Sequence, residues 1–462
     1  MSTSTSDITL SPPGTRRVAW RGWGDLFGVA ALASNVVVIW LWVSNQGIQK
    51  LDVNAPATLV LPTGLLASNL MLLQVLMVAR IPVIERAWGF DVLARRHRIA
   101  GFVSFWLMVA HVVLTVIVYA TQDSGWDKLW WVVIRQPGIL MAVIGTLLIV
   151  VAVALSIRAA RRRLRYESWH LIHLYTYAGM GLALPHQILV GPDFRQTAWA
   201  RVYWWTLYLA AALAVLIFRV ALPLWRSWYH RLRVLEVVTE APGTTSVLVG
   251  GRRLNELPLR AGQFCFWRFL DGPGWSRAHP YSVSMAPRAD FLRVTIQDVG
   301  DGSARAATLQ AGTRALIEGP YGRLTADLRT RDRLVFIAAG TGITPIRALL
   351  EELPYEPGDA TLVYRVSDPD GALFAAELAE LAEQRGLTLH VLAGPRRDDD
   401  SWLPRSVPAD TSDAEYLARL APGVADSDVY LCGPPRWMTS VHTAALKAGV
   451  PRGRLHTEEF TW

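Results

Sequence analysis

The order of apolar and polar residues divides the chain near residue 225. Before that point, apolar runs follow one another that are long enough to cross a hydrocarbon layer about 30 Å thick. After it, much shorter apolar runs are separated by turn residues. We therefore predict a membrane all-α bundle of six helices, with spans at about 24–44, 58–79, 99–120, 137–157, 169–190 and 199–222.

The second half of the chain shows two patterns in succession. Short alternating segments between residues 231 and 319 predict a small antiparallel β-barrel. Apolar strands then alternate with helical stretches at 344–353, 372–385, 412–420 and 436–448, which is the pattern of an α/β doubly wound domain. The predicted domains are a disordered tail at 1–20, a transmembrane domain at 21–228, a barrel at 229–328 and a nucleotide-binding domain at 329–462.

Composition and charge change this picture in one respect, the topology. Hydrophobic residues make up 52% of the 462 residues, too many for an ordinary soluble chain. The net charge of +8 does not indicate nucleic-acid binding, because basic residues gather at the ends of apolar segments, as at 158–165. By the positive-inside rule, both termini and the whole second half lie in the cytoplasm of a plasma-membrane protein. Trp126, Trp130 and Trp131 fit an aromatic belt at the outer interface.

Two smaller features concern processing and compartment. The first twenty residues contain no short apolar core followed by a small-residue cleavage site, so we expect the first apolar run to be a permanent span. Cys265 and Cys432 match no zinc or disulfide spacing, which fits a reduced compartment.

Four histidines lie in the third and fifth predicted helices, and ionisable side chains inside a membrane are costly and usually functional. His111 lies in the middle of the third span and His97 near the cytoplasmic end of the same helix, and His186 and His173 lie at corresponding depths of the fifth. The 14-residue spacing in the third span corresponds to a rise of about 21 Å and a rotation of about 40°, so one face offers two imidazoles. Pairing by depth gives His97 with His173 and His111 with His186. Each pair could supply the two axial ligands of a b-type haem, so we predict two haems.

The fifth span fits this scheme less simply. Its two histidines are 13 residues apart, which in an ideal helix places them about 140° apart around the axis. Two glycines and Pro185 lie between them, so we expect this helix to be bent or locally rewound. His170, one turn before His173, remains an alternative ligand.

Short motifs occur in a definite order along the second half. They are HPYS at 279–282, GS at 302–303, EGPYG at 318–322, GTGITP at 340–345, LCGPP at 431–435 and the terminus EEFTW at 458–462. Glycines in the turn at 340–345 let backbone amides and a helix N-terminus approach a pyrophosphate. In the fifth span, YESW at 166–169 precedes His173.

Taken together, these motifs resemble the ferredoxin–NADP reductase superfamily joined to a ferric-reductase-type transmembrane domain, the architecture of ferric reductases and NADPH oxidases. The resemblance covers about residues 21–462 and implies that the barrel binds FAD. Tyr281 would flank the isoalloxazine, Ser282 would lie near its reactive nitrogen and His279 would help to hold the cofactor. The implied FAD-binding residues are His279, Pro280, Tyr281, Ser282, Gly302 and Ser303.

The resemblance also implies a nicotinamide site in the last domain. Cys432 would lie beside the nicotinamide, and a terminal aromatic ring would cover the flavin until nicotinamide displaces it. Phe460 fits that role better, with Trp462 as the alternative. The implied nucleotide-binding residues are Gly340, Thr341, Gly342, Thr344, Pro345, Gly433 and Pro434.

A group of polar residues follows the second and third strands of the predicted nucleotide domain. Arg365 and Ser367 follow one strand, and Arg396 and Arg397 follow the next. Such a group could grip the 2′-phosphate of the cofactor, which favours NADPH over NADH.

The resulting hypothesis is an electron relay from NADPH (or NADH) through FAD and two haems to an acceptor at the outer face. Ferric chelates, oxygen, and a quinone or partner protein all fit as acceptors. We favour a ferric reductase because the chain is short and has no regulatory domain. The alternatives are an NADPH oxidase, a haem-free flavin reductase anchored in the lipid bilayer, and a membrane channel or proton path with a nucleotide sensor. The sequence indicates no partner protein and no oligomeric state.

Overall fold

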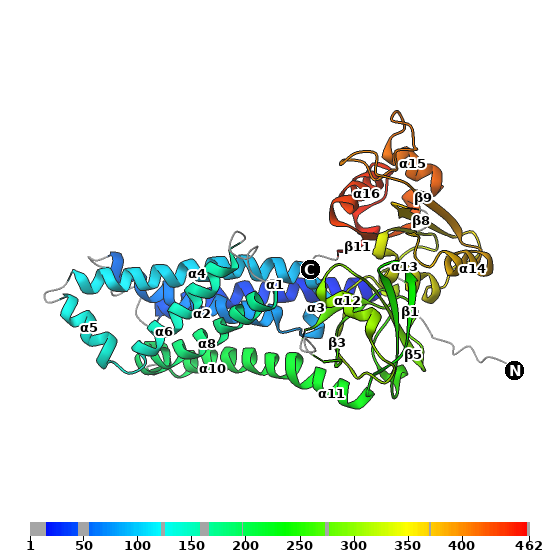
Figure 1. Cartoon of the computed structure of the whole chain (residues 1–462). Helices are drawn as coiled ribbons and strands as arrows, with labels where there is room; N and C mark the ends of the chain where they lie inside the picture. Colours follow the sequence, from blue (N-terminus) through cyan, green and yellow to red (C-terminus); the bar gives the residue numbers. More distant parts are fainter. Residues whose placement is uncertain are drawn as a thin grey trace. The chain divides into compact units, whose positions relative to one another are not determined.

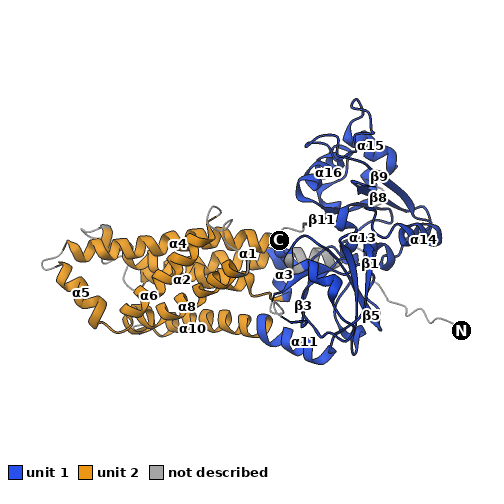
Figure 2. Ribbon diagram, in the orientation of Figure 1, with its two compact units in different colours: residues 1–24, 82–91, 219–462 blue, residues 25–81, 92–218 orange. Residues whose placement is uncertain are grey.

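The structure is a computed structural model that describes residues 15–44, 55–121, 125–157, 166–195, 197–272, 277–368 and 371–459 (Figure 1). The chain forms two compact units, which Figure 2 colours separately. One comprises residues 1–24, 82–91 and 219–462, and the other comprises residues 25–81 and 92–218. We call them the nucleotide unit and the helical unit. The basic segment at 158–165 lies outside the described residues.

The nucleotide unit begins, after α3 (Pro82–Trp88) and α11 (Leu222–His230), with the barrel that alternation predicts. Its strands are β1 (Arg233–Ala241), β2 (Thr244–Gly250), β3 (Phe264–Phe269), β4 (His279–Ser282), β5 (Phe291–Gln297) and β6 (Ala315–Tyr321). They form two antiparallel sheets, β1-β2-β5 and β4-β3-β6. Isolated bridges, one between Arg233 and Arg314 and one between Val283 and Val294, join the two sheets. The short strand β4 was not predicted from the sequence.

A five-stranded parallel sheet follows the barrel. Its strands are β7 (Leu334–Ala339), β8 (Ala360–Val366), β9 (Thr388–Ala393), β10 (Asp428–Gly433) and β11 (Leu455–Glu459), in the order β11-β10-β7-β8-β9. The helices between them are α13 (Ile343–Glu352), α14 (Ala375–Arg385), α15 (Asp413–Leu420) and α16 (Pro435–Lys447), each within a few residues of the predicted stretch. The sequence did not predict that the C-terminal segment adds β11.

One hydrophobic core is shared by the barrel and the parallel sheet. Val247 and Trp267 of the barrel belong to the same buried cluster as Phe336, Ile346 and Leu349 of the nucleotide-binding domain. Since burial of apolar surface is the main stabilising term in folding, this shared core holds the two domains in one unit.

The helical unit contains the apolar helices that the hydrophobic pattern predicts. Its elements, some shared with the other unit, are α1 (Thr15–Trp42), α2 (Ala55–Val78), α4 (Phe90–Ala120), α5 (Gly125–Arg135), α6 (Ile139–Ser156), α8 (Tyr166–Val190), α9 (Pro192–Arg195), α10 (Ala198–Ala214) and the π-helix η2 (Val215–Ala221).

Within the described residues, five helical stretches are long and apolar enough to cross a membrane. They are Trp23–Trp42, Pro56–Val78, Val92–Ala120, Ile139–Ser156 and Ala198–His230. The remaining predicted span, at 169–190, forms helix α8, but its histidines, tyrosines and Gln187 lower its hydropathy. The chain is thus a multi-pass membrane protein, while the count of six spans stays a prediction.

Two helices differ from the predictions made for them. Helix α1 already begins at Thr15, so the prediction that residues 15–20 are disordered is wrong; these residues lack glycine and proline and continue the helix. Helix α8 was expected to be bent or locally rewound, and it is α-helical without interruption from Tyr166 to Val190 with Pro185 inside it, so the rewinding is absent and the bend stays a prediction. Membrane helices tolerate proline where neighbouring groups satisfy the freed carbonyl.

Buried polar side chains connect three helices of this unit. Asn69 of α2 is fully buried, and its Oδ1 accepts hydrogen bonds from Ser34 Oγ of α1 (2.9 Å) and Tyr203 OH of α10 (2.7 Å). Asn69 Nδ2 in turn donates to Asn35 Oδ1 at 3.2 Å. In an apolar surrounding such interhelical hydrogen bonds replace partners that water would otherwise supply, so they fix how these helices associate.

Helices α6 and α8 approach each other through glycines. A Cβ added to Gly145 of α6 would lie 2.4 Å from the carbonyl oxygen of Gly179, and one added to Gly179 would lie 2.7 Å from that of Gly145. Small residues of this kind let helix backbones come close in membranes. This contact fixes α8, and with it the two histidines that α8 carries.

We expect Gly145→Leu to lower the stability of the detergent-purified protein by about 1–3 kcal/mol, because the new side chain has no room beside Gly179. Gly181→Leu on α8 is the matched control, since nothing lies within 4 Å of a Cβ added to Gly181. The measurement is the thermal unfolding midpoint of each variant. Equal midpoints for the two variants would contradict the close approach of α6 and α8.

Candidate functional site

The strand β4 carries the HPYS motif and pairs with β3, so that Ser282 lies opposite Phe264 and Tyr281 opposite Cys265. Ser282 is buried, and its hydroxyl has no hydrogen-bond partner. Burial also raises the pKa of the Tyr281 phenol, which therefore stays protonated. Buried hydroxyls are almost always paired, so the orphaned Ser282 Oγ marks a position where a bound polar ligand completes the hydrogen bonding.

A cavity opens beside this strand. The aromatic rings of Trp267, Phe269, His279 and Tyr281 form part of its lining, together with the arginines Arg277 and Arg305. Asp271 also lines the cavity and pairs with Arg305 at 2.8 Å. Aromatic surface suits a flat ring system and guanidinium groups suit phosphates, so the cavity fits a flavin nucleotide. The residues present therefore fit the FAD that the motifs imply.

Sequence reasoning missed both arginines of this cavity. Arg277 stands two residues before the HPYS motif, and Arg305 stands two residues after Ser303. Their positions next to two recognised motifs were the available signal. Ser303 itself is engaged locally: its Oγ accepts from the Val299 amide (2.9 Å) and donates to the Gly300 carbonyl (2.8 Å), which closes the turn before α12 (Asp301–Ala304).

The glycine turn after β7 leads directly into the N-terminus of helix α13. Gly340 has a φ of +53°, and Gly340–Gly342 form a short 3-10 turn that leads into α13. A Cβ at Gly342 would lie 2.3 Å from the Cys432 carbonyl oxygen, so only glycine allows the turn to pack on the end of β10. Thr344 Oγ1 donates to the Thr341 carbonyl at 2.9 Å, and Pro345 occupies the first turn of α13, where its missing N–H costs nothing.

The Cys-Gly-Pro segment lies at the end of the neighbouring strand β10. Cys432 is fully buried, and burial raises the pKa of its thiol well above the usual value, so it is not a thiolate nucleophile. Gly433 lies against the ring of Trp437, and Pro434 caps α16. Since β7 and β10 are adjacent and parallel, the two turns lie at one edge of the sheet, where dinucleotides bind in this class of fold. Phe460 and Trp462 lie outside the described residues.

The arginines predicted to grip a 2′-phosphate are engaged within the protein. Arg365 is buried and donates to the carbonyl oxygens of Val366, Leu392 (3.1 Å) and Gly394 (2.6 Å). Arg396 donates to the carbonyls of Ser401 and Asp399 and to Ser440 Oγ, and Arg397 pairs with Asp413 at 2.8 Å. Ser367 is exposed.

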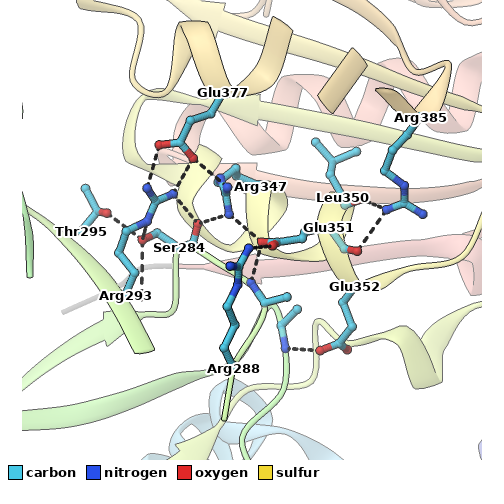
Figure 3. A network of polar contacts seen from close by, with 12 residues as sticks. Ser284, Arg288, Arg293, Thr295, Arg347, Leu350, Glu351, Glu352, Glu377 and Arg385 are labelled. Carbon is cyan, nitrogen blue, oxygen red and sulfur yellow. Dashed lines mark hydrogen bonds and ion pairs between the residues drawn. The ribbon is translucent and has the colours of Figure 1, made fainter. Parts of the chain in front are cut away.

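A buried ionic network joins the residues just after strand β4 to helix α13, which follows the glycine turn (Figure 3). Arg293 of β5 binds both carboxylate oxygens of Glu377 of α14, at 2.7 and 2.9 Å, and also donates to Ser284, two residues after β4 ends. Arg347 of α13 pairs with Glu377 at 2.7 Å and with Glu351 at 2.8 Å. The arginine pairs lower the pKa of Glu377 despite the opposing effect of its partial burial. The network thus ties the flavin motif to the nucleotide turn.

In the helical unit, the first pair of predicted histidines lies ring to ring. The centroids of His97 and His173 are 6.1 Å apart, and their planes meet at 82°. His97 Nδ1 lies 3.2 Å from the Gln74 carbonyl oxygen. His173 stacks on Trp169 at 5.5 Å, and its Nδ1 lies 3.5 Å from Ser156 Oγ. The rival His170 is also near Trp169, at a ring distance of 6.3 Å.

The second pair is held by backbone and by glycine. His111 Nδ1 lies 2.7 Å from the Val60 carbonyl oxygen, and a Cβ at Gly64 would lie only 2.7 Å from that ring nitrogen. Gly138, with a φ of +84°, packs against the backbone nitrogen of His186. His186 Nδ1 is buried and has no hydrogen-bond partner. Among the described residues, no group of three or more His, Cys, Asp or Glu side chains lies close enough together to hold a metal ion.

Comparison with known families agrees with both halves of this description. Residues 63–184 match the family described as the ferric reductase like transmembrane component, and residues 336–443 match the oxidoreductase NAD-binding domain. The chain joins a ferric-reductase-like membrane domain to an NAD-binding oxidoreductase module. This confirms the predicted resemblance and the predicted class of enzyme, an NAD(P)H-dependent oxidoreductase.

Individual relatives match the oxidoreductase module. The chain is 31% identical over 236 residues to the ferredoxin reductase component of 3-ketosteroid-9-alpha-monooxygenase from Rhodococcus rhodochrous, which covers 50% of this chain and 64% of that protein. It is 25% identical over 240 residues to a flavohemoprotein of Candida albicans, covering 49% of this chain and 58% of the relative. The chain thus spans less than two thirds of these relatives.

Among solved structures, the FAD/NAD-binding domain of nitric oxide dioxygenase from Vibrio cholerae covers 50% of this chain and 98% of its own length. Its sequence identity is 25% and its TM-score is 0.40. A ferredoxin NADP+ reductase from Neisseria gonorrhoeae covers 50% of this chain and 97% of its own length, at 23% identity and a TM-score of 0.39.

We expect Glu377→Gln to weaken the nucleotide unit by about 3 kcal/mol, because it leaves the buried Arg293 and Arg347 without their shared counter-charge. For a unit of this size, that corresponds to a fall of roughly 6–12 °C in the midpoint of thermal unfolding. Glu380→Gln on the same helix is the control, since Glu380 is exposed and its hydrogen bond to Gln384 lies at the surface. A midpoint for Glu377→Gln equal to that of the control would show that the network contributes nothing.

Proposed function

We propose that this chain transfers electrons from cytoplasmic NAD(P)H, through FAD and two b-type haems, to an acceptor at the outer face of the plasma membrane, and that this acceptor is a ferric chelate. The established part of this statement is a membrane-linked, flavin-dependent NAD(P)H oxidoreductase. The haems, the direction of transfer, the cytoplasmic placement of both termini and the acceptor are the proposal.

The geometry of His97 and His173 is the observation that carries the haem assignment. An imidazole nitrogen lies about 2.0–2.1 Å from a metal that it ligates, and the ring centre roughly 1.1 Å farther, so two imidazoles that held one iron between them would have ring centres about 6.3 Å apart. The two centroids are 6.1 Å apart. This separation supports a haem iron between the rings, and His173 as its ligand in preference to His170.

The hydrogen bonds of the ring nitrogens support the same assignment. A carbonyl oxygen can only accept, so the proton of His97 is on Nδ1, facing Gln74, and that of His111 is on Nδ1, facing Val60. Each ring therefore presents an unprotonated Nε2, the nitrogen that would ligate a haem iron. Histidine ligands of metals commonly donate their other N–H to a backbone carbonyl, which fixes the tautomer and the orientation of the ring.

Close contacts with two glycines support the assignment of His111 and His186 as the outer pair. The ring of His111 lies so close to Gly64 that a side chain at residue 64 would clash with it. Gly138, in a loop, packs against the backbone of His186. His111 and His186 would then hold the second haem.

The residues of the nucleotide unit have complementary tasks. The flavin, when bound, accepts two electrons together and releases them singly, which a haem requires. Tyr281 and the cavity rings would hold the flat ring system, and Ser282 Oγ would supply a hydrogen bond to it. The turn at 340–342 would hold the pyrophosphate of the nicotinamide cofactor at the N-terminus of α13.

We favour a ferric chelate as the acceptor because the membrane segment at 63–184 matches the ferric reductase like transmembrane component. Oxygen remains the outcome that would make the chain an oxidase, and loss of all haem would make it a membrane-anchored flavin reductase. Both outcomes are distinguished by the two experiments that follow.

We expect the detergent-purified protein to show a Soret band and b-type bands at two haems per flavin, which shift when NADH or NADPH is added without oxygen. His173→Ala should lose half of the haem, because it removes one axial ligand of the inner site. His170→Ala, one turn earlier, is the matched control and should retain both haems. A spectrum with flavin but no haem would overturn the relay.

We expect His111→Ala to stop the reduction of an external ferric chelate while the remaining haem is still reduced by the nicotinamide cofactor. The reason is that His111 serves the outer site alone. Thr115→Val, one turn further along α4, is the control and should keep the external activity. Chelate reduction is measured by the colour of a ferrous-specific dye, and superoxide formation in the same assay would identify oxygen as the acceptor. Full external reduction by His111→Ala would exclude the outer haem assignment.

A further inference from the structure

The segment that leaves strand β8 lies beside the pyrophosphate turn. Strands β7 and β8 are parallel neighbours, with Ala339 opposite Arg365, so the residues after Val366 emerge next to Gly340. Tyr364 OH accepts a hydrogen bond from the amide of Leu373 at 3.1 Å and lies 3.5 Å from the Gly340 carbonyl oxygen. The chain therefore leaves β8 and returns alongside the glycine turn. In doubly wound folds the adenosine ribose of a dinucleotide lies at the end of this second strand.

The cations near this edge are already used to hold the fold. Arg365 is 5% exposed and bridges the ends of β8 and β9 through the carbonyls of Val366, Leu392 and Gly394. To grip a phosphate it would have to abandon these carbonyls, and leaving buried carbonyls unpaired is costly.

The two remaining arginines brace the segment after β9 in a similar way. Arg396 donates to the carbonyls of Asp399 and Ser401 and to the Ser440 hydroxyl. Arg397 donates to the carbonyls of Pro408 and Thr411 and pairs with Asp413. A bidentate phosphate contact needs guanidinium N–H groups that point into the site, whereas Arg396 donates within its own loop and to Ser440 of α16, and Arg397 donates to the segment at 408–413.

The first charged residue after β8 is an acid. Asp368 comes two residues after the last residue of the strand and is exposed. A carboxylate there can accept hydrogen bonds from the two hydroxyls of an adenosine ribose. The same carboxylate would repel a 2′-phosphate, which carries between one and two negative charges, roughly −1.5 to −2, at neutral pH.

We infer that the nucleotide site selects NADH over NADPH, and that Asp368 is the residue that determines this selectivity. The inference rests on one part of the proposed function, namely that a nicotinamide cofactor delivers hydride to the flavin of this module. It reverses the preference that the number of arginines in the sequence indicated, because these arginines are engaged in backbone contacts.

The test measures anaerobic reduction of the flavin in the full-length protein by stopped-flow absorbance, once with NADH and once with NADPH. For the native protein, we expect kcat/KM to be at least about tenfold higher with NADH. Asp368→Asn should lower this ratio by about tenfold, mainly through a lower KM for NADPH, because the repulsion is removed. Asp368→Glu should keep the preference for NADH. Asp332→Asn is the control, since this exposed acid lies before β7, at the opposite end of the strand from the glycine turn.

Three results would overturn the inference. The first is a native protein that prefers NADPH, and the second is an Asp368→Asn variant whose ratio equals that of Asp332→Asn. The third is an Arg396→Gln variant that loses NADPH turnover selectively, which would show that this arginine grips a 2′-phosphate. The readout is flavin reduction and needs no haem, so a haem-free protein would overturn the electron relay and leave the selectivity measurable.

Discussion

Helix α2 provides the hydrogen bonds on which the helical unit depends. In an apolar surrounding every buried polar group must find its partner inside the protein. The carbonyls of Val60 and Gln74 face two ring nitrogens of histidine, and the side chains of Ser68 and Asn69 bond to residues of α8, α1 and α10. One helix thus connects to most of its neighbours through polar contacts. His97 and His111 are held in position because α2 is held in position.

The nucleotide unit depends on a different kind of contact, a shared carboxylate. Glu377 accepts from Arg293 of the barrel and from Arg347 of the helix that follows the glycine turn. Arg293 also holds Ser284, so the strand with the flavin motif and the helix of the nucleotide turn are joined through three side chains. Hydride transfer requires two bound ring systems to be held with their reacting atoms about 3–3.5 Å apart. A network of this kind, together with the shared hydrophobic core, gives the two domains the rigidity that such an encounter needs.

Much of this fold is predictable from sequence, because it rests on periodicity. The alternating strands of the barrel and the helices of the nucleotide domain lie within a few residues of their predicted positions. Strand β4 escaped prediction because its four residues include a proline and do not alternate. The candidate site carries motifs that point to Tyr281 and Gly340, and the structure places these two residues in the cavity lining and in the turn before α13. It was not predictable where the partner is a backbone carbonyl, as at Val60, since a carbonyl has no signature in the sequence.

The spacing of the carbonyl partners links these two levels of description. His97 and His111 are 14 residues apart on α4, and their partners Gln74 and Val60 are 14 residues apart on α2, in the reverse order. Equal spacing in reverse order is what two antiparallel α-helices give, because both advance by the same rise per residue, about 21 Å over this distance. Helix α2 therefore runs opposite to helix α4, as the alternation of basic loops predicts. The contacts between α2 and α4 fix the positions of both His97 and His111 along the helix axis. The distance between these two histidines along that axis therefore follows from helix geometry alone.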